Sequence, residues 1–517
     1  MLLKMQRTRK KTTQWNIIFQ YIQIFLTMIS GIVLVPLYLK FISLNIYGAW
    51  LATGNVLAWI AAIDPGLSSV LQQKIGKAYG EKNMGYIGEL ISSGIAINLL
   101  IFLFLIIVGI IVSNYLFQWL NFSEQIQQSN LLSAFLLAVI GSAFLIFSFS
   151  FGAINRGLQG SAAIGFINTV VYIGSIILTI TLLYKGYGVL TLGIGHVFRG
   201  LILCLCHIGY LSWRVISERI KIPVSLTKVR SLSKLISYTF VSKIAAVFSS
   251  NLDLFFISKF LGPESVAVLN MTRQASNVSK GFVFRPTVAF APAVSHLIGA
   301  NEEDKARMVL LRLFRIIFWF LGLLTAGFIV FNQSFVTLWV GAKLYAGSAI
   351  NIYICIGFFV TIVVNSFGNI CFALGNIRGN SIATFIQSIL SILFLYLGVK
   401  YFDMAGAILA PVIAMMLITF WYFPISFFKI LKLDKNEIFQ FLQEILIILV
   451  VSVPVSLLFL QGQADSWLGF AARAIPFCLL YLTGLFLLSK KFKAEILGIL
   501  AKFRVKLSFS KANQGLL

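Results

Sequence analysis

Long apolar runs, each followed by a short polar or basic segment, recur along the whole 517-residue chain. A helix that crosses the hydrocarbon core of a bilayer needs about 20 predominantly apolar residues, and most of these runs approach that length. The pattern therefore predicts an all-α integral membrane protein with about fourteen transmembrane helices. The predicted spans are 15–39, 46–71, 88–112, 130–152, 161–184, 188–212, 236–260, 265–296, 309–331, 349–374, 381–399, 404–427, 443–460 and 467–489.

The composition agrees with this pattern and excludes a large soluble domain. Hydrophobic residues make up 59% of the chain and charged residues 11%, whereas about 25% of residues are charged in soluble domains. The segments between spans are too short for a catalytic domain, and the sequence contains no Walker A loop. We therefore expect no enzyme activity, no cofactor and no metal site.

Basic residues are distributed unequally between alternate connecting segments. With a cytoplasmic N-terminus, 29 of the 41 Lys and Arg residues lie on the cytoplasmic side, five on the opposite side and seven within spans. Cytoplasmic loops of membrane proteins are enriched in Lys and Arg, so this asymmetry predicts that both termini are cytoplasmic. It also explains the net charge of +25 without nucleic acid as a partner.

Weak internal similarities indicate a duplicated architecture. Segments 41–48, 75–83 and 157–160 resemble segments 260–267, 294–302 and 372–375, at offsets of 219, 219 and 215 residues. Two parallel six-helix lobes around a central cavity form a transporter architecture. We predict an N-terminal lobe over 1–212, a cytoplasmic linker over 213–235, a C-terminal lobe over 236–427, two further helices over 428–489 and a basic cytoplasmic tail over 490–517. Within the tail, residues 492–507 alternate apolar and basic side chains, as an interfacial amphipathic helix does.

Charged side chains within spans mark the candidate site, because each costs on the order of 3 kcal/mol at the centre of a bilayer. The eighth span carries Asn270, Arg273, Asn277 and Lys280 at intervals of three and four residues, which places them on one helical face. A face with two cations is expected to line the protein interior or a hydrated cavity. Prolines 286 and 292 predict a bend or break further along this span.

Further polar side chains extend the candidate cavity. Arg199, Lys243 and Arg285 are additional cations within spans, and Gln20 and Gln23 belong to a polar stripe on the first span. A cationic cavity attracts anions, and the planar fork of Arg suits phosphate. We predict that the substrate-binding cations are Arg273, Lys280, Arg199, Lys243 and Arg285, and that Asn270, Asn277, Gln20 and Gln23 supply polar lining. In the alternative interpretation, the same stripes bond helices to one another.

Two acidic residues within spans are candidates for ion coupling. A carboxylate in a low-dielectric environment can titrate near neutral pH, so Asp64 and Asp253 are candidates for coupling transport to H⁺ or Na⁺. Asp64 precedes Pro65 and Gly66, however, and could instead cap or interrupt a helix.

Several segments of the sequence resemble one family of membrane proteins. Segments 36–50, 64–67 and 251–264, with 292–295 and 373–376, are similar to polysaccharide-repeat (O-antigen type) flippases of the multidrug/oligosaccharidyl-lipid/polysaccharide exporter superfamily. The resemblance covers roughly residues 14–430 and departs from the family in the turn over 42–45.

The resemblance implies a two-lobed, V-shaped, alternating-access transporter of the bacterial inner membrane. Its substrate would be an undecaprenyl-pyrophosphate-linked oligosaccharide, moved from the cytoplasmic to the periplasmic leaflet for O-antigen or another surface polysaccharide. Membrane lipids surround such a protein, and polysaccharide polymerase machinery would be its partner.

Three other functions remain open. A multidrug exporter of the same superfamily is disfavoured by the central cations, which repel organic cations. A flippase for a peptidoglycan or teichoic-acid precursor would share the fold. A polysaccharide polymerase or ligase would need catalytic residues in external loops, which are short and nearly uncharged here.

Overall fold

The computed structural model describes residues 2–61, 67–120, 122–123, 126, 130–223, 229–230, 232–233, 252–299, 302–498 and 500–501. Within these residues the secondary structure is helical, without a strand, and ten helices are long and apolar enough to cross a membrane. The predicted all-α membrane fold is therefore confirmed. The chain divides into two compact units, which are described separately: a first unit of Met1–Leu269 with Thr384–Pro411, and a second unit of Asn270–Ala383 with Val412–Leu517.

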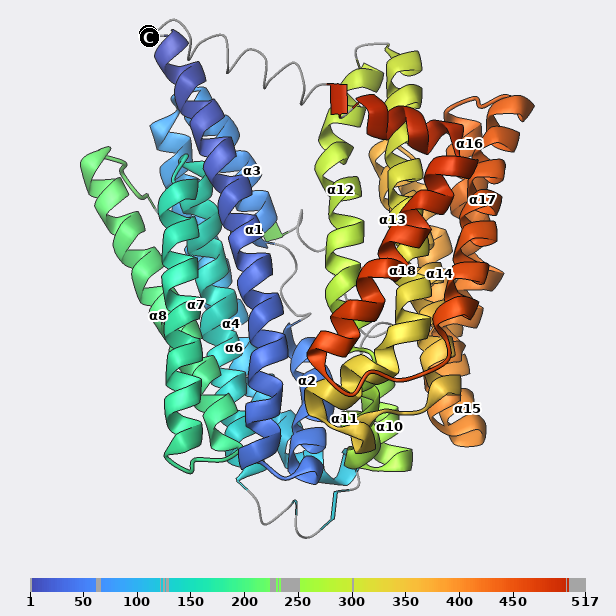
Figure 1. Ribbon diagram of the computed structural model, residues 1–517. Coiled ribbons are helices and arrows are strands. Elements are labelled where there is room, and N and C mark those ends of the chain that lie inside the picture. Colours follow the sequence, from blue (N-terminus) through green and yellow to red (C-terminus); the bar gives the residue numbers. More distant parts are fainter. Residues whose placement is uncertain are drawn as a thin grey trace, which may run out of the picture. The chain divides into compact units, whose positions relative to one another are not determined.

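Eight helices make up most of the first unit (Figure 1), and several of them are longer than their predicted spans. They are α1 (Leu2–Phe41), α2 (Leu44–Ala61), α3 (Leu67–Gly80), α4 (Met84–Leu120), α6 (Leu131–Gly157), α7 (Ser161–Tyr184), α8 (Leu190–Ser217) and α10 (Asp253–Leu261). Helix α7 coincides with its predicted span, whereas α1, α4, α6 and α8 continue into polar sequence. Hydropathy detects only the apolar part of a helix, so the polar ends were not predicted.

Close backbone contacts hold α6 against α8. A Cβ atom added at Gly200 of α8 would lie 2.2 Å from the carbonyl oxygen of Gly141, and one at Gly193 would lie 2.4 Å from that of Ala134. Such distances are possible only because these residues lack side chains. Within a bilayer the hydrophobic effect does not drive helices together, because lipid tails are as apolar as the side chains. Small residues stabilise the interface instead by allowing close van der Waals packing.

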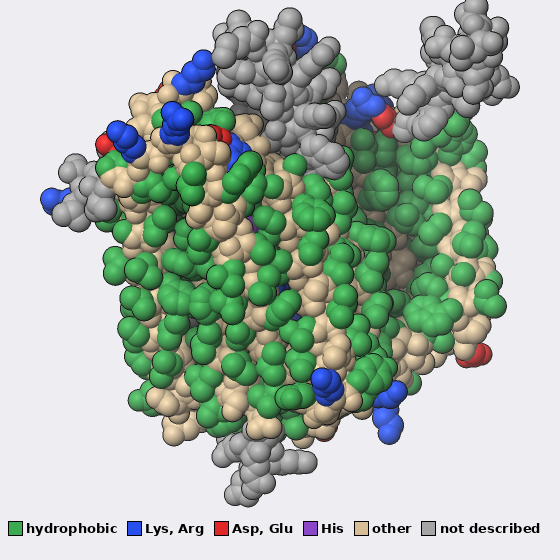
Figure 2. All heavy atoms as spheres, turned by 90° about the vertical axis from the view of Figure 1, so that its left-hand side faces the viewer, with side chains coloured by type: hydrophobic (Ala, Val, Ile, Leu, Met, Phe, Trp, Pro, Cys, Tyr) green, Lys and Arg blue, Asp and Glu red, His purple; other side chains and the backbone are tan. Residues whose placement is uncertain are grey.

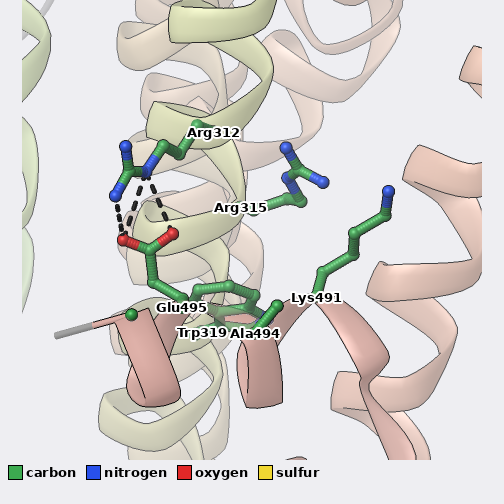
Figure 3. Close-up of a pocket in the computed structure, with 7 residues that line it drawn as sticks. Arg312, Arg315, Trp319, Lys491, Ala494 and Glu495 are labelled. Atoms are coloured by element: carbon green, nitrogen blue, oxygen red, sulfur yellow. Dashed lines mark hydrogen bonds and ion pairs between the residues drawn. The ribbon is translucent and has the colours of Figure 1, made fainter. Parts of the chain in front are cut away.

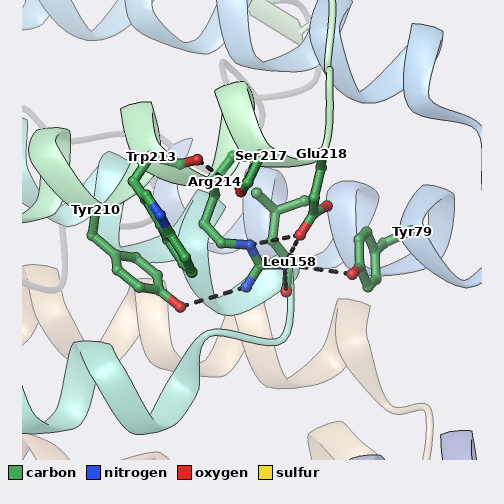
Figure 4. A network of polar contacts seen from close by, with 7 residues as sticks. All are labelled: Tyr79, Leu158, Tyr210, Trp213, Arg214, Ser217 and Glu218. Atoms are coloured by element: carbon green, nitrogen blue, oxygen red, sulfur yellow. Dashed lines mark hydrogen bonds and ion pairs between the residues drawn. The ribbon is translucent and has the colours of Figure 1, made fainter.

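A polar network around Arg214 ties together the ends of three helices in the first unit (Figure 4). Arg214 Nε of α8 donates to Glu218 at 2.6 Å, and Nη2 donates to the carbonyl oxygen of Leu158, after α6, at 2.7 Å. Nη2 also approaches the hydroxyl of Tyr79 in α3 at 3.4 Å. Burial, followed by the Glu218 charge, raises the pKa of Tyr79, so this phenol stays neutral.

The second unit is a helical bundle with an aromatic core. Phe314, Phe367 and Phe427 come from three different helices, and their ring centroids lie 4.2 to 5.1 Å apart. Burial of large rings in offset and edge-to-face contact stabilises such a core. The helices of this unit are α12 (Gln274–Gly299), α13 (Glu303–Val340), α14 (Ser348–Ala373), α16 (Thr419–Ile430), α17 (Lys435–Phe459) and α18 (Trp467–Leu488); α11 (Pro263–Thr272) and α15 (Ile377–Leu417) contribute residues to both units.

One predicted span breaks at another position than expected, and a kink separates two others where the sequence predicts a connection. The predicted eighth span is interrupted at Arg273, between α11 and α12, whereas α12 remains helical through residues 286 and 292. A break at the prolines is therefore wrong, whereas a bend there stays a prediction. In α15, Phe402 and Asp403 have non-helical backbone angles, and Asp403 has a φ of 50°. This kink separates the predicted spans 381–399 and 404–427 and brings Gly398 against Gly406.

The number of transmembrane helices stays a prediction. One candidate span, Arg378–Ile430, contains the kink in α15 and therefore covers two predicted spans. The predicted spans 46–71, 236–260 and 265–296 have no counterpart among the ten candidates, and residues 62–66 and 234–251 lie outside the described part. The predicted lobe boundaries likewise stay predictions.

The exterior of the protein is apolar, as a lipid-facing surface requires. One face carries a broad band of hydrophobic side chains, with Lys and Arg side chains above and below it (Figure 2). Leu100 on α4 is 65% exposed and Leu468 on α18 is 84% exposed. Large apolar side chains are common at such exposure only where lipid replaces water, which confirms a multi-pass integral membrane protein.

Candidate substrate-binding site

A cavity of about 320 Å³ lies within the first unit, among α1, α3, α6 and α7. Its polar lining contains one cation, three amides and a hydroxyl, and no carboxylate. The lining residues are Phe19, Gln23, Gln72, Arg156, Ser161, Ile164, Gly165 and Asn168. Gln23 is the predicted site residue that the structure places in this cavity.

Arg156 supplies the positive charge of the cavity. It lies in the last turn of α6, is half-buried, and its Nε donates to Gln72 Oε1 across a distance of 3.3 Å. Sequence reasoning assigned Arg156 to a cytoplasmic connection because the apolar run appeared to end at residue 152. One signal could have identified it, since Arg156 is the only charged residue between 130 and 184.

Asn168 joins the cavity to a buried histidine. His207 Nε2 lies 3.1 Å from Asn168 Oδ1, and His207 Nδ1 lies 3.0 Å from the carbonyl oxygen of Ser148. His207 is 2% exposed, so its ring bonds α6, α7 and α8 together and does not face water. The interpretation of polar residues as bonds between helices therefore holds for this histidine.

A second polar group surrounds Arg199, one of the predicted cations. The Arg199 guanidinium carbon lies 4.7 Å from the ring centroid of Tyr172, in a cation–π arrangement. The Tyr172 hydroxyl in turn lies 2.6 Å from Ser30 Oγ on α1. Arg199 Nε is buried and has no hydrogen-bond partner among the described residues. A buried guanidinium nitrogen needs an acceptor, so water or an anionic group is expected beside it.

The structure places four predicted residues around the start of α12. Asn270 lies in the last turn of α11, Arg273 at the junction of α11 and α12, and Asn277 and Lys280 on α12. Lys280 Nζ donates to Asn277 Oδ1 over 3.4 Å. Asn277 is exposed, whereas Asn270, Arg273 and Lys280 are half-buried. Whether they bind substrate stays a prediction.

The remaining predicted residues are only partly described. Asp64 and Lys243 lie outside the described residues, and Gln20 and Arg285 are described only as backbone positions of α1 and α12. Asp253 lies in the first turn of α10, where the helix dipole stabilises a negative charge. No group of three His, Cys, Asp or Glu side chains in the described part could hold a metal ion.

Comparison with solved structures identifies the fold. The fold is similar to the inward closed conformation of the lipid II flippase MurJ, with a TM-score of 0.67 and 16% identity over 91% of this chain and 98% of that one. An inward-facing MATE family multidrug resistance transporter gives a TM-score of 0.63 and 14% identity over 78% and 98% of the two chains. A MOP superfamily transporter from Pyrococcus furiosus, described by the reverse polarity of its binding pocket, gives a TM-score of 0.57. Its sequence identity is 15%, over 83% of this chain and 97% of that one. This chain is therefore an integral membrane protein with the fold of the MOP superfamily transporters.

A family model adds a narrower relationship. The model described as "Polysaccharide biosynthesis protein" matches residues 97–347, while no curated protein matches the sequence significantly. This match covers slightly less than half of the chain, and it agrees with the resemblance to polysaccharide flippases without by itself assigning the family.

Proposed function

We propose that this protein moves undecaprenyl-pyrophosphate-linked oligosaccharide repeat units from the cytoplasmic to the periplasmic leaflet of a bacterial inner membrane. Transport would proceed by alternating access, with both termini cytoplasmic, and would supply O-antigen or another surface polysaccharide. Polysaccharide polymerase machinery would use the translocated units. The family match to polysaccharide biosynthesis proteins supports this assignment.

The cavity around Arg156 is the observation that carries the proposal. A pyrophosphate carries negative charge and several acceptor oxygens, which suit a guanidinium. The side-chain amides of Gln23, Gln72 and Asn168 could bond sugar hydroxyls. The volume of about 320 Å³ lies at the lower end of the range of ligand pockets, about 300–1,000 Å³, so the cavity would hold a headgroup and not a whole repeat unit.

The position of this cavity agrees with loading from the cytoplasmic leaflet. Arg156 precedes the connection between α6 and α7, which the charge pattern predicts to be cytoplasmic. Arg199, with its buried Nε, would supply a second cation deeper in the same unit. Arg273 and Lys280 are proposed as further substrate contacts, and Asp64 and Asp253 as ion-coupling groups. An exporter of organic cations remains disfavoured, because the cavity offers such cargo no carboxylate.

The sidedness of lipid-linked glycans in living cells tests the proposal. Cells lacking the protein should retain undecaprenyl-linked repeat units on the cytoplasmic leaflet and lose surface polysaccharide. Arg156→Gln should restore at most about a tenth of the surface polysaccharide, since loss of one charge-assisted contact to phosphate costs roughly a factor of ten. Lys185→Gln, an exposed cation after α7, is the matched control and should restore it fully.

Three outcomes would contradict all or part of the proposal. Repeat units that reach the periplasmic leaflet normally in cells lacking the protein would exclude this substrate. If the cells instead accumulate a peptidoglycan or teichoic-acid precursor on the cytoplasmic leaflet, the protein is a flippase for that precursor. Full activity of Arg156→Gln would remove the cavity from the mechanism without excluding transport.

A further inference from the structure

A second cavity lies in the second unit, where the chain continues beyond α18. Ser489 interrupts the helix after α18, and residues 490–498 are helical again. Ser489 Oγ accepts a hydrogen bond from the backbone N–H of Phe492 at 3.0 Å and donates one to Glu444 at 2.7 Å. The ring of Phe492 packs edge-on against Trp319 of α13, with centroids 5.0 Å apart. These contacts fix residues 490–498, here called the C-terminal helix, against α13 and α17.

The cavity between α13 and the C-terminal helix has a volume of about 390 Å³ and a basic lining (Figure 3). Helix α13 contributes Arg312, Arg315 and Trp319 to the lining. The C-terminal helix contributes Lys491, Ala494, Glu495 and Gly498. The lining therefore contains three cations and one carboxylate.

Glu495 forms its direct ion pair with Arg312, whereas Glu495 and Glu444 attract Arg315 without a direct ion pair among the described contacts. Arg312 Nε donates to Glu495 at 3.0 and 3.1 Å, and Arg312 Nη2 contacts the same carboxylate. Arg315 Nε donates to the carbonyl oxygen of Leu311, which fixes the base of its guanidinium. Figure 3 shows Arg315 and Lys491 extending to the same side of the cavity, away from Glu495. Two positively charged groups thus converge where an anion can reach both.

The surroundings of the cavity are those of a membrane interface. Leu497 of the C-terminal helix is 49% exposed, and Lys490 and Lys493 are exposed cations of the same helix. Apolar and basic residues on one short helix place it at the boundary between lipid headgroups and acyl chains. A ligand that enters this cavity from such a boundary carries a phosphate and an apolar tail.

We propose that this cavity binds the phosphate of an anionic phospholipid headgroup, with Arg315 and Lys491 as its ligands. An Arg fork binds two phosphate oxygens, and a Lys ammonium adds a point charge. Basic pockets beside membrane helices have the charge and geometry that lipid headgroups require. The bound lipid would hold the C-terminal helix against α13. This site is separate from the cavity around Arg156 and does not depend on the transported substrate.

Lipid retention by the purified full-length protein tests the site. Native mass spectrometry would count phosphatidylglycerol molecules retained in detergent, with phosphatidylcholine as the neutral probe. Arg315→Gln and Lys491→Gln should each weaken retention of phosphatidylglycerol about fivefold, because each substitution removes one of the two cations that bind the lipid phosphate. Lys490→Gln is the matched control, as it removes a neighbouring exposed cation that does not line the cavity. Its retention should remain close to that of the unmodified protein.

Defined outcomes would overturn the proposal. Equal retention of phosphatidylglycerol by Lys491→Gln and Lys490→Gln excludes a specific site; Lys491 is exposed, so this variant should fold. Equal retention of phosphatidylglycerol and phosphatidylcholine excludes recognition of net charge. Complete displacement of the lipid by millimolar inorganic phosphate would identify free phosphate as the ligand. Because the readout is lipid binding, none of these results bears on the flippase assignment.

Discussion

Arg214 shows what one charged side chain can do at the end of a membrane helix. Its guanidinium is bonded to Glu218, to the carbonyl oxygen of Leu158 and to the hydroxyl of Tyr79, so three helix ends converge on one group. The side chain is only 12% exposed. At such burial, hydrogen bonds to a charged group contribute more than those of an exposed ion pair.

Arg214→Met should therefore destabilise the first unit. Removal of the guanidinium leaves Glu218 and a backbone carbonyl without their donors, which should cost about 2–3 kcal/mol. Thermal unfolding in detergent would show a lower midpoint. Arg219→Met is the matched control, because Arg219 is exposed on the segment that follows α8. Equal midpoints for the two variants would show that the network contributes nothing.

The sequence predicts site residues where a helical stripe marks them and misses them where a helix extends beyond its apolar part. Gln23 belongs to a polar stripe with a period close to that of a helix, and it lines the cavity of the first unit. Arg156 follows the apolar run by a few residues, so the positive charge was assigned to a connection. The burial of His207 is a feature that periodicity alone cannot show, because Ser148 and Asn168 bond its two ring nitrogens from other helices.

At the scale of elements, the two segments that resemble each other in sequence, 41–48 and 260–267, contact each other through their backbones. Gly48 lies in the first copy of the similarity over 41–48, and Pro263 lies in the second copy over 260–267. A Cβ atom at Gly48 would lie 1.9 Å from the carbonyl oxygen of Pro263, so α2 and the start of α11 touch through their backbones. Both residues belong to the first unit.

Gly48→Ala should consequently disrupt this contact. The added methyl group overlaps backbone atoms that cannot rotate away, and overpacking of this kind costs about 1–3 kcal/mol. The yield of folded protein and its unfolding midpoint in detergent would both fall. Gly54→Ala, on the same helix, adds a methyl group that meets nothing within 4 Å and should behave like the unmodified protein. Unchanged stability of Gly48→Ala would show that α2 and α11 separate without cost.

Element boundaries were predicted best where composition changes abruptly. Helix α7 matches its prediction, since Ser161 follows a glycine and Lys185 directly follows its last residue. The eighth span was predicted as one helix because apolar and polar residues keep a helical period through Arg273. Hydropathy and periodicity do not detect a local break of one residue, and the prolines indicate a break at positions where the helix continues. Small residues such as Gly141 and Gly200 carry no hydropathy signal, yet they determine how closely α6 and α8 pack.

At the scale of the whole molecule, the unequal distribution of Lys and Arg is the sequence signal that predicts the orientation of the protein. Five Lys residues were assigned to the external side, and all five are exposed: Lys40, Lys185, Lys259, Lys343 and Lys400. Each follows or closely precedes the end of a helix, except Lys400 before the kink in α15. The Lys residues that define the external side are therefore exposed, and labelling reagents can reach these positions.

The orientation can be tested with two matched positions in the first unit. Lys82, between α3 and α4, and Lys185, between α7 and α8, are both exposed, and they are predicted to lie on opposite sides of the membrane. In intact cells with a permeable outer layer, a membrane-impermeant maleimide should label Lys185→Cys, and it should label Lys82→Cys only after lysis. The unmodified protein measures the background from its five native cysteines, three of which are buried. Labelling of Lys82→Cys in intact cells would reverse the orientation and place the cavity around Arg156 at the external side, where a substrate made in the cytoplasm could not load.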